Sequence, residues 1–376
     1  MAISAAGIVF SNLNDNTLSR LTGDRTVAAI PFACRYRLID FPLSNLVNAD
    51  VSKIHVIANY NYRSLVEHIG SGKDWDLARR KDGINVISPY QTAKTSTAGV
   101  FKTHMEALKS IKQYINEFHE EYVILMDSDN VLNIDLQDVI KEHERFSSDV
   151  TIVTKSIGKD FESKHNRMLI SAIAGKITDA VMGNSYNGKN NEACLDIFVM
   201  KTEYLRTLID EAEAYGINSF TGMLISKYKN SNYRTYCYGG YNASVSSFLD
   251  YYKSSIRLAT DKKARESLLF RKEAPIFTRV HNSSPVVYKS TAYVENSMIA
   301  DDCIIEGTVI NSILCRGVHV GKGAVVKNSV LFKKTTVGKN ATVNCIVTDK
   351  DVTISDGVVL SGNDNMPFYV GKCQHV

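Results

Sequence analysis

The sequence predicts an α/β protein with two domains, a Rossmann-like domain built on a mixed sheet and a C-terminal parallel β-helix. Three observations support this fold class. Short apolar runs alternate with helical patterns over the first two-thirds of the 376 residues, which is typical of βαβ units. Beyond residue 290, β-branched residues recur at a nearly constant spacing and no helical period is visible. Pro275 and Pro285 lie between the two regions.

Strands and helices are expected to alternate along the first region. We expect strands over 5–10, 53–58, 85–90, 121–129 and 149–155, and helices over 61–70, 103–119 and 135–146. The apolar run Val123–Met126 indicates a strand that is buried on both faces, as in parallel sheets covered by helices. A doubly wound sheet is therefore expected.

A long helical segment over 245–272 closes this domain, and the two prolines mark the connector behind it. We therefore expect an α/β domain over 1–265, a linker over 266–290, a β-helix over 291–365 and a C-terminal tail over 366–376.

The repeat in the last region has steps of five or six residues. It runs through Val294, Ile299, Ile304, Ile310, Leu314, Val320, Val326, Leu331, Val337 and Val343. Hexapeptide repeats of this kind are typical of a parallel β-helix, in which each short strand supplies one side of a prism. An antiparallel sandwich would not maintain such a spacing.

Composition excludes several classes of protein. The chain has 44 basic and 40 acidic residues and a formal charge of +4, without a Lys/Arg-rich run, so we expect no nucleic-acid partner. No apolar stretch approaches the roughly 18 residues of a membrane span, so no membrane partner is expected. The N-terminus lacks a basic signal region, and seven scattered cysteines form no CxxC pair. We expect a cytoplasmic protein with reduced thiols.

The N-terminal region resembles the glucose-1-phosphate adenylyltransferases, also called ADP-glucose pyrophosphorylases. The resemblance lies in Tyr36–Asn45 (YRLIDFPLSN), His68–Gly70 and Trp75–Leu77, and it continues through the repeat. It implies a nucleotidyltransferase domain of the GT-A-like type, followed by a left-handed β-helix, and usually a tetramer.

The phosphate-binding segments of that family are degenerate here. The strand Gly7–Phe10 leads into Ser11–Thr17, which has no glycine and carries Asp15, although glycines and positive charge are what such a loop needs. The family's phosphate-binding Lys falls on Val27. Arg25 and Arg37 are retained, and the resemblance makes them candidates for an effector or anion contact. Structural salt bridges are an equally good interpretation of both arginines.

The metal-binding positions are only partly retained. Asp129 aligns with the family's catalytic, Mg²⁺-coordinating carboxylate, and Asp127 is an additional acid beside it. Asn242 stands at the second metal position, where the family has Asp. Segment 96–100 has lost the family's GTADA pattern, and 175–190 contains no EKP match. Loss of several electrostatic contacts predicts little intrinsic activity.

The resemblance therefore implies a regulatory or scaffolding subunit, of the non-catalytic GlgD type, for glucose-1-phosphate adenylyltransferase in glycogen biosynthesis. Its partner would be the catalytic subunit in a hetero-oligomer, plausibly a heterotetramer under allosteric control. This chain would require no cofactor, whereas the partner would use Mg²⁺ and ATP. Weak homo-oligomerisation is left open.

Two other hypotheses remain at this point. The chain could be an active sugar-phosphate nucleotidyltransferase whose Mg²⁺ site is rebuilt around Asp127 and Asp129. It could also be a small-molecule sensor or a hexapeptide acyltransferase, an enzyme class that uses a histidine between coils. His319 is the single histidine within 291–365.

Overall fold

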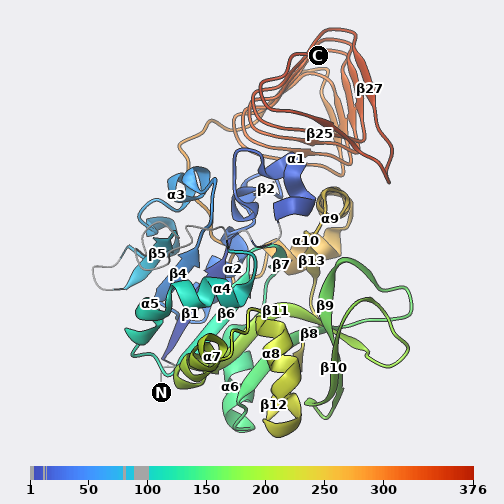
Figure 1. Ribbon diagram of the computed structural model, residues 1–376. Coiled ribbons are helices and arrows are strands. Elements are labelled where there is room, and N and C mark those ends of the chain that lie inside the picture. The colour runs from blue at the N-terminus through green and yellow to red at the C-terminus, as the bar shows by residue number, and fades with distance from the viewer. Residues whose placement is uncertain (1–3, 12, 14, 79–81, 89–100) are drawn as a thin grey trace.

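The computed structural model describes residues 4–11, 13, 15–78, 82–88 and 101–376. An α/β domain occupies the N-terminal two-thirds, and a triangular β-helix sits on one side of it (Figure 1). No helix in these ranges is long and apolar enough to cross a membrane. The predicted fold class is confirmed.

A nine-stranded mixed sheet forms the centre of the α/β domain, in the order β5-β4-β1-β6-β11-β8-β12-β10-β9. Its strands are β1 (Ala5–Phe10), β4 (Lys53–Ile57), β5 (Gly83–Ile87), β6 (Tyr122–Asp127), β8 (Val150–Ser156), β9 (Glu162–Ile173), β10 (Lys176–Ser185), β11 (Glu192–Lys201) and β12 (Tyr233–Cys237). Strands β5, β4, β1 and β6 are parallel, whereas β11 runs antiparallel to β6.

Helices cover both faces of this sheet. They are α2 (Asp40–Asn48), α3 (Arg63–Ile69), α4 (His104–Ser110), α5 (Lys112–Asn116), α6 (Leu136–Arg145), α7 (Thr202–Ala214) and α8 (Phe220–Lys227). Ile8 and Phe10 of β1 pack into the core with α4, α5, α7 and α8, whereas Val9 packs into the core with α2, α3 and α6. The period of two along a strand explains this division. Expected helix 103–119 is two shorter helices, with Ile111 between them.

Two small pairings complete the domain: β2 (Pro31–Phe32) with β3 (Tyr36–Arg37), and β7 (Asn130–Leu132) with β13 (Asn242–Ser244). The helix α1 (Ser19–Thr22) lies close to the β-helix (Figure 1). The helical segment expected over 245–272 is divided into α9 (Phe248–Thr260) and α10 (Lys262–Leu269). Asp261 separates them, because its carboxylate caps α10 by accepting from the Ala264 N–H.

The β-helix has five coils whose strands form three parallel sheets. The first sheet contains β14 (Val287–Tyr288), β17 (Ile304–Ile305), β20 (His319–Val320), β23 (Thr336–Val337) and β26 (Thr353–Ile354). The second contains β15 (Tyr293–Glu295), β18 (Thr308–Ile310), β21 (Val325–Lys327), β24 (Thr342–Asn344) and β27 (Val359–Ser361). The third contains β16 (Met298–Ile299), β19 (Ile313–Leu314), β22 (Val330–Leu331), β25 (Ile346–Thr348) and β28 (Phe368–Val370).

Three details of the sequence-based prediction need correction. Ile305 and Val309, rather than Ile304 and Ile310, fill the interior, because they pair with the inward-facing Val320 and Val326 of the next coil. The expected tail over 366–376 instead belongs to the β-helix: β28 pairs with β25, and the Val376 N–H donates to the Thr353 carbonyl at 2.9 Å. The expected linker is also shorter than 266–290, since α10 ends at Leu269 and β14 begins at Val287.

The two domains share one hydrophobic core. It includes Tyr251 and Tyr252 of α9 together with Phe332 and Val347 of the β-helix. Within this core, Arg25 donates to both carboxylate oxygens of Asp349 at 2.7 and 2.9 Å, and both side chains are at most 5% exposed. A second pair across the junction, Lys372–Asp24, is about half exposed.

We predict that Asp349→Asn lowers the free energy of unfolding by about 3–5 kcal/mol, because it leaves the Arg25 guanidinium buried and uncompensated. Asp24→Asn is the matched control at the exposed pair, where we expect at most about 1 kcal/mol. Urea unfolding midpoints measure both changes. Equal effects of the two substitutions would contradict the assignment of Arg25–Asp349 as the dominant ion pair of the junction.

Candidate functional site

The two retained acids lie where β6 ends, at the carboxyl edge of the parallel strands. This edge is where open α/β sheets usually bind ligands. Asp127 is the last residue of β6, and Asp129 follows two positions later; both are buried. The Val245 N–H donates to the Asp129 carbonyl at 2.8 Å. The segment after β13 is thereby held beside these acids.

Asp127 is already paired with a base. His104, the first residue of α4, lies with its Nε2 2.8 Å from Asp127 Oδ1. Burial lowers the pKa of His104, but the charge and hydrogen bond of Asp127 raise it by more, so the net shift is upward. Burial also raises the pKa of Asp127, and the hydrogen bond to His104 occupies one of its carboxylate oxygens. Asp127 is therefore a poor candidate for holding a metal ion.

A second buried base, Arg167 of β9, lies among the acids. Its guanidinium donates to Asp196 Oδ2 at 2.8 Å, to the Cys194 carbonyl at 3.2 Å and to Ser244 Oγ. Burial lowers the pKa of Arg167, whereas Asp196 and then Asp129 raise it, and the net shift is upward. Sequence reasoning missed Arg167 and Asp196, because no motif marks them.

The structure brings Ser244, not Asn242, closest to the retained acids. In the β13–β7 ladder, Ser244 lies opposite Asn130, and Asn242 lies opposite Leu132, two positions further from Asp129. Asn242 and Ser244 both line a cavity of about 430 Å³, together with Lys155 and Arg167. Neither side chain supplies a second carboxylate next to Asp129.

Apolar side chains fill the space where the strand β1 leads into its loop. Leu13 packs against the core, and with Phe10 and Val27 it lines a cavity of about 10 Å³ beside Asp127 and Asp129. That volume is about the minimum for a single water molecule. Segment 96–100, with its altered GTADA pattern, lies outside the described residues.

The family's Mg²⁺ does not fit these residues as they are arranged. Within the described ranges, no three metal-ligating side chains are placed to hold a metal together. Mg²⁺ is usually bound by one or two carboxylates together with substrate phosphates. Here one carboxylate is paired with His104, and the cavity beside the acids, lined by Leu13 and Val27, measures only about 10 Å³.

A second site lies at the junction of the two domains and is strongly basic. It is a cavity of about 280 Å³. Its basic lining residues are Arg35, Arg37, His68, Arg279, His281, Arg316, Lys333 and Lys350, and Glu67 is the acid that lines it. Of the two arginines singled out in the sequence, Arg37 lies here, whereas Arg25 is paired with Asp349. The sequence offered Arg25 and Arg37 as equivalent candidates for an anion contact, whereas in the structure only Arg37 lines the pocket.

The basic side chains of this junction pocket repel one another. Burial, followed by the charges of Arg37 and Arg25, lowers the pKa of Lys350 to about 8. Burial also lowers the pKa of Arg37 to about 10 and that of His281 to about 4. A bound anion would offset the repulsion. The pocket therefore has the size and charge for a small phosphate-bearing or other anionic ligand.

Buried contacts hold the pocket's α/β side in place. Arg37 Nη1 donates to the Ser64 carbonyl at 2.6 Å, and its backbone N–H donates to Asp40 Oδ2 at 2.9 Å. Asp40 Oδ1 lies 2.6 Å from His68 Nε2. The motif Tyr36–Asn45 thus links α2 to α3 and positions Arg37, which explains the motif without assigning it any chemistry.

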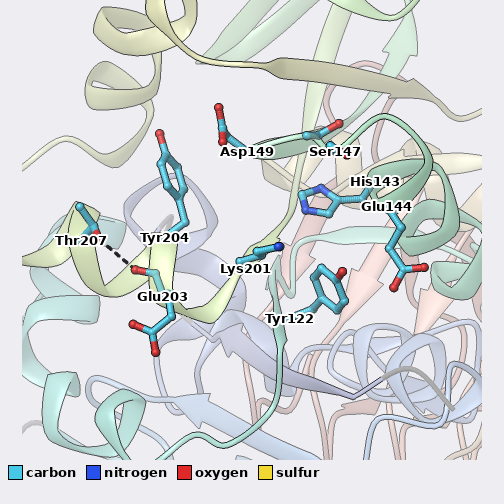
Figure 2. A pocket seen from close by; sticks show the side chains of 10 residues that line it. Tyr122, His143, Glu144, Ser147, Asp149, Lys201, Glu203, Tyr204 and Thr207 are labelled. Carbon is cyan, nitrogen blue, oxygen red and sulfur yellow. Dashed lines mark hydrogen bonds between the residues drawn. The ribbon is translucent and has the colours of Figure 1, made fainter. Parts of the chain in front are cut away.

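Another cavity, of about 440 Å³, lies at the opposite edge of the sheet, where β6 begins (Figure 2). Tyr122, His143 and Lys201 line it together with the acids Glu144, Asp149 and Glu203. Burial lowers the pKa of His143 to about 4. This cavity contains neither the retained acids nor the excess positive charge of the junction pocket, so we do not assign the candidate function to it.

The fold and these two sites define a nucleotidyltransferase-type domain joined to a hexapeptide β-helix. Family models agree: residues 16–164 match the nucleotidyl transferase family, and residues 283–367 match the GlmU-like C-terminal hexapeptide family.

Similarity to whole proteins is more specific. The chain is 35% identical to the glycogen biosynthesis protein GlgD of Bacillus subtilis (strain 168), over 97% of this chain and 95% of that protein. It is 32% identical to GlgD of Geobacillus stearothermophilus, over 85% and 82% of the two chains. It is 26% identical to a glucose-1-phosphate adenylyltransferase of Thermosipho melanesiensis, over 86% and 78%. The chain belongs to the GlgD family.

We predict that inorganic phosphate or pyrophosphate binds the junction pocket and raises the melting temperature. Binding should weaken as pH rises from 7 to 9, because Lys350, with a pKa of about 8, loses its charge over this range. Differential scanning fluorimetry at several pH values measures the shift.

Lys350→Met should reduce the melting-temperature shift and flatten its pH dependence. Lys339→Met is the matched control, since Lys339 is an exposed lysine of the same β-helix outside the pocket. If the Lys350 variant retained the full pH-dependent shift, the anion would be bound elsewhere.

Proposed function

We propose that this chain is a non-catalytic subunit that assembles with a glucose-1-phosphate adenylyltransferase and tunes its activity in glycogen biosynthesis. The partner would make ADP-glucose and pyrophosphate from ATP and glucose 1-phosphate. Support comes from the name of the GlgD relatives, which assigns them to glycogen biosynthesis, and from the similarity to adenylyltransferases.

The observation that carries the proposal is the small size of the cavity beside Asp129, about 10 Å³, which is lined by Leu13 and Val27. A nucleotide triphosphate cannot enter a space of that size. The core, the β-helix and the interdomain ion pair are intact around it. On this proposal the folded body serves assembly, and the positioning of phosphates and metal on which phosphoryl chemistry depends has been lost.

On this proposal the chain needs no cofactor, and Mg²⁺ and ATP serve the catalytic partner. Both subunits would act in the cytoplasm as a hetero-oligomer, for which we favour a heterotetramer. The junction pocket is our candidate for an anionic effector, with Arg37 as a contact. Because the pocket is lined by residues of both domains, an anion bound there would add to the contacts that hold the junction, and its binding energy would be coupled to assembly with the partner.

The alternative is an active nucleotidyltransferase with a metal site rebuilt around Asp127 and Asp129. The two neighbouring acids favour this hypothesis, but the pairing of Asp127 with His104 argues against it. The acyltransferase hypothesis is weaker still. His319, its single candidate, is partly exposed, and its Nε2 lies 3.4 Å from Glu306 Oε1.

The test measures pyrophosphate release from ATP and glucose 1-phosphate with Mg²⁺. We expect no release by this chain alone, and a mixture that exceeds the rate of the adenylyltransferase from the same genome by several-fold. Mixing the chain with a catalytically dead variant of that partner should give no release, because on the proposal this chain performs no chemistry even when assembled.

Two results would overturn the proposal. One is a mixture no faster than the partner alone at any effector concentration, with no co-elution of the two chains. The other is release by the chain alone or with the dead partner. If Asp129→Asn abolished that release, the rebuilt-site alternative would be correct.

A further inference from the structure

The charge balance around Arg167 carries an inference that goes beyond the proposed subunit role. Arg167 belongs to β9, and its side chain reaches the acids at the carboxyl end of β6. Arg167 is 8% exposed. Asp196 forms an ion pair with it at 2.8 Å, and Asn130 Nδ2 bridges Asp196 to Asp129 with donor–acceptor distances of 3.5 and 3.2 Å. The charges of Asp129 and Asp127 also raise the pKa of Arg167. A buried guanidinium is stable only where such acids compensate it.

The same reasoning applies to the acids. Asp127 and Asp129 are at most 5% exposed, and Asp196 is 17% exposed. Three carboxylates so placed require positive charge nearby. His104 supplies it to Asp127, and Arg167 supplies it on the side of Asp196 and Asp129. Other enzymes balance such a group of acids with a divalent cation.

The backbone at Asp196 indicates that this pairing is specific. Asp196 has a φ of +54° at an irregularity of β11, where the pairing with β8 shifts between Cys194 and Ile197. A positive φ is unfavourable for a residue with a side chain, although Asp tolerates it better than most. Such a bulge turns a side chain toward a site. Here the carboxylate it presents binds Arg167, and this ion pair offsets the strain.

We propose that Arg167 is a built-in cation that takes the place of a divalent metal ion and closes this site to Mg²⁺. The guanidinium is tethered to β9, so it neutralises the acids without any metal in solution. A metal ion would have to displace the Arg167 guanidinium, which is covalently attached to β9 and cannot diffuse away. This inference concerns the isolated chain, and it holds or fails independently of any regulatory role.

The test is a gain of metal binding. Arg167→Met removes the charge but retains an extended side chain, so the positive charge beside Asp196 and Asp129 is lost and a metal ion can supply it. We expect the full-length variant to bind Mn²⁺ at least about tenfold more tightly than the unaltered chain, as measured by electron paramagnetic resonance of free Mn²⁺. Adding Asp129→Asn to the variant should abolish the gain.

Arg206→Met is the matched control. Arg206 is also a largely buried arginine of the α/β domain, but it donates to the carbonyls of Ile115 and Phe118 and contacts none of the three acids. We expect no Mn²⁺ binding by this variant. Binding by both variants would show a general effect of removing an arginine and would overturn the proposal.

Each remaining outcome also decides the matter. A folded Arg167→Met chain that binds no Mn²⁺ overturns the proposal, as does tight Mn²⁺ binding by the unaltered chain.

If Arg167→Met does not fold, refolding it with about 5 mM Mn²⁺, on the order needed to saturate a weak site, tests directly whether a metal ion can replace the guanidinium. Refolding of Arg167→Met by Mn²⁺ would support the need for a cation at this position. If Mn²⁺ does not refold it although Arg167→Lys folds, a metal ion cannot replace Arg167. The readout is metal binding or folding, so it is unaffected by whether the chain activates a partner.

Discussion

The buried ion pair between Arg25 and Asp349 is the interaction on which the rest of the structure depends. Each charge comes from a different domain, and each is almost completely removed from water. Neither domain can bury its own member of the pair without the other, because an unpaired buried charge costs several kcal/mol. The junction is therefore not a hinge between independent bodies. The hydrophobic core that crosses it has the same consequence.

The chain contains two clusters of charged side chains, one at the end of β6 and one at this junction. They differ in whether the chain itself supplies the opposite charge. At the end of β6, acids are matched by His104 and Arg167, and the cavity beside Asp127 and Asp129 measures only about 10 Å³. In the junction pocket, basic groups outnumber the acids, and burial, followed by the charges of Arg37 and Arg25, lowers the pKa of Lys350. The first arrangement is complete within the chain. The second has an excess of positive charge that an anion would offset, so it is the better candidate for communication with other molecules.

The sequence predicted the fold well, because its elements rest on local patterns. Alternating apolar residues in β1 and the near-hexapeptide repeat both translate directly into buried faces. The inward position was misjudged where two apolar residues adjoin, as at Ile304 and Ile305, since only the neighbouring coil decides between them. The last strand, β28, was missed because its partner β25 lies about 20 residues earlier along the chain, and its preceding turn carries no repeat signal.

The candidate site was less predictable, for a physical reason. Loss of glycines and of the basic residue at Val27 was legible in the sequence, and the closed cavity agrees with it. Arg167, Asp196 and Ser244 come from three separate strands, so only the folded sheet brings them together. The one local signal was an Asp within an otherwise apolar strand, Cys194–Met200, where a buried charge requires a partner.

The way in which the catalytic features were lost bears on what the chain does. Random decay of an unused site would leave cavities and unpaired charges, each of which destabilises the fold. Here Leu13 and Val27 fill the vacated space, and the retained acids have found bases. The replaced groups are therefore consistent with one another, which indicates that the domain is maintained as a rigid body. The proposed subunit role requires a rigid domain and a junction pocket that binds an anion, because these two properties together would let the chain pass a binding signal to an active partner.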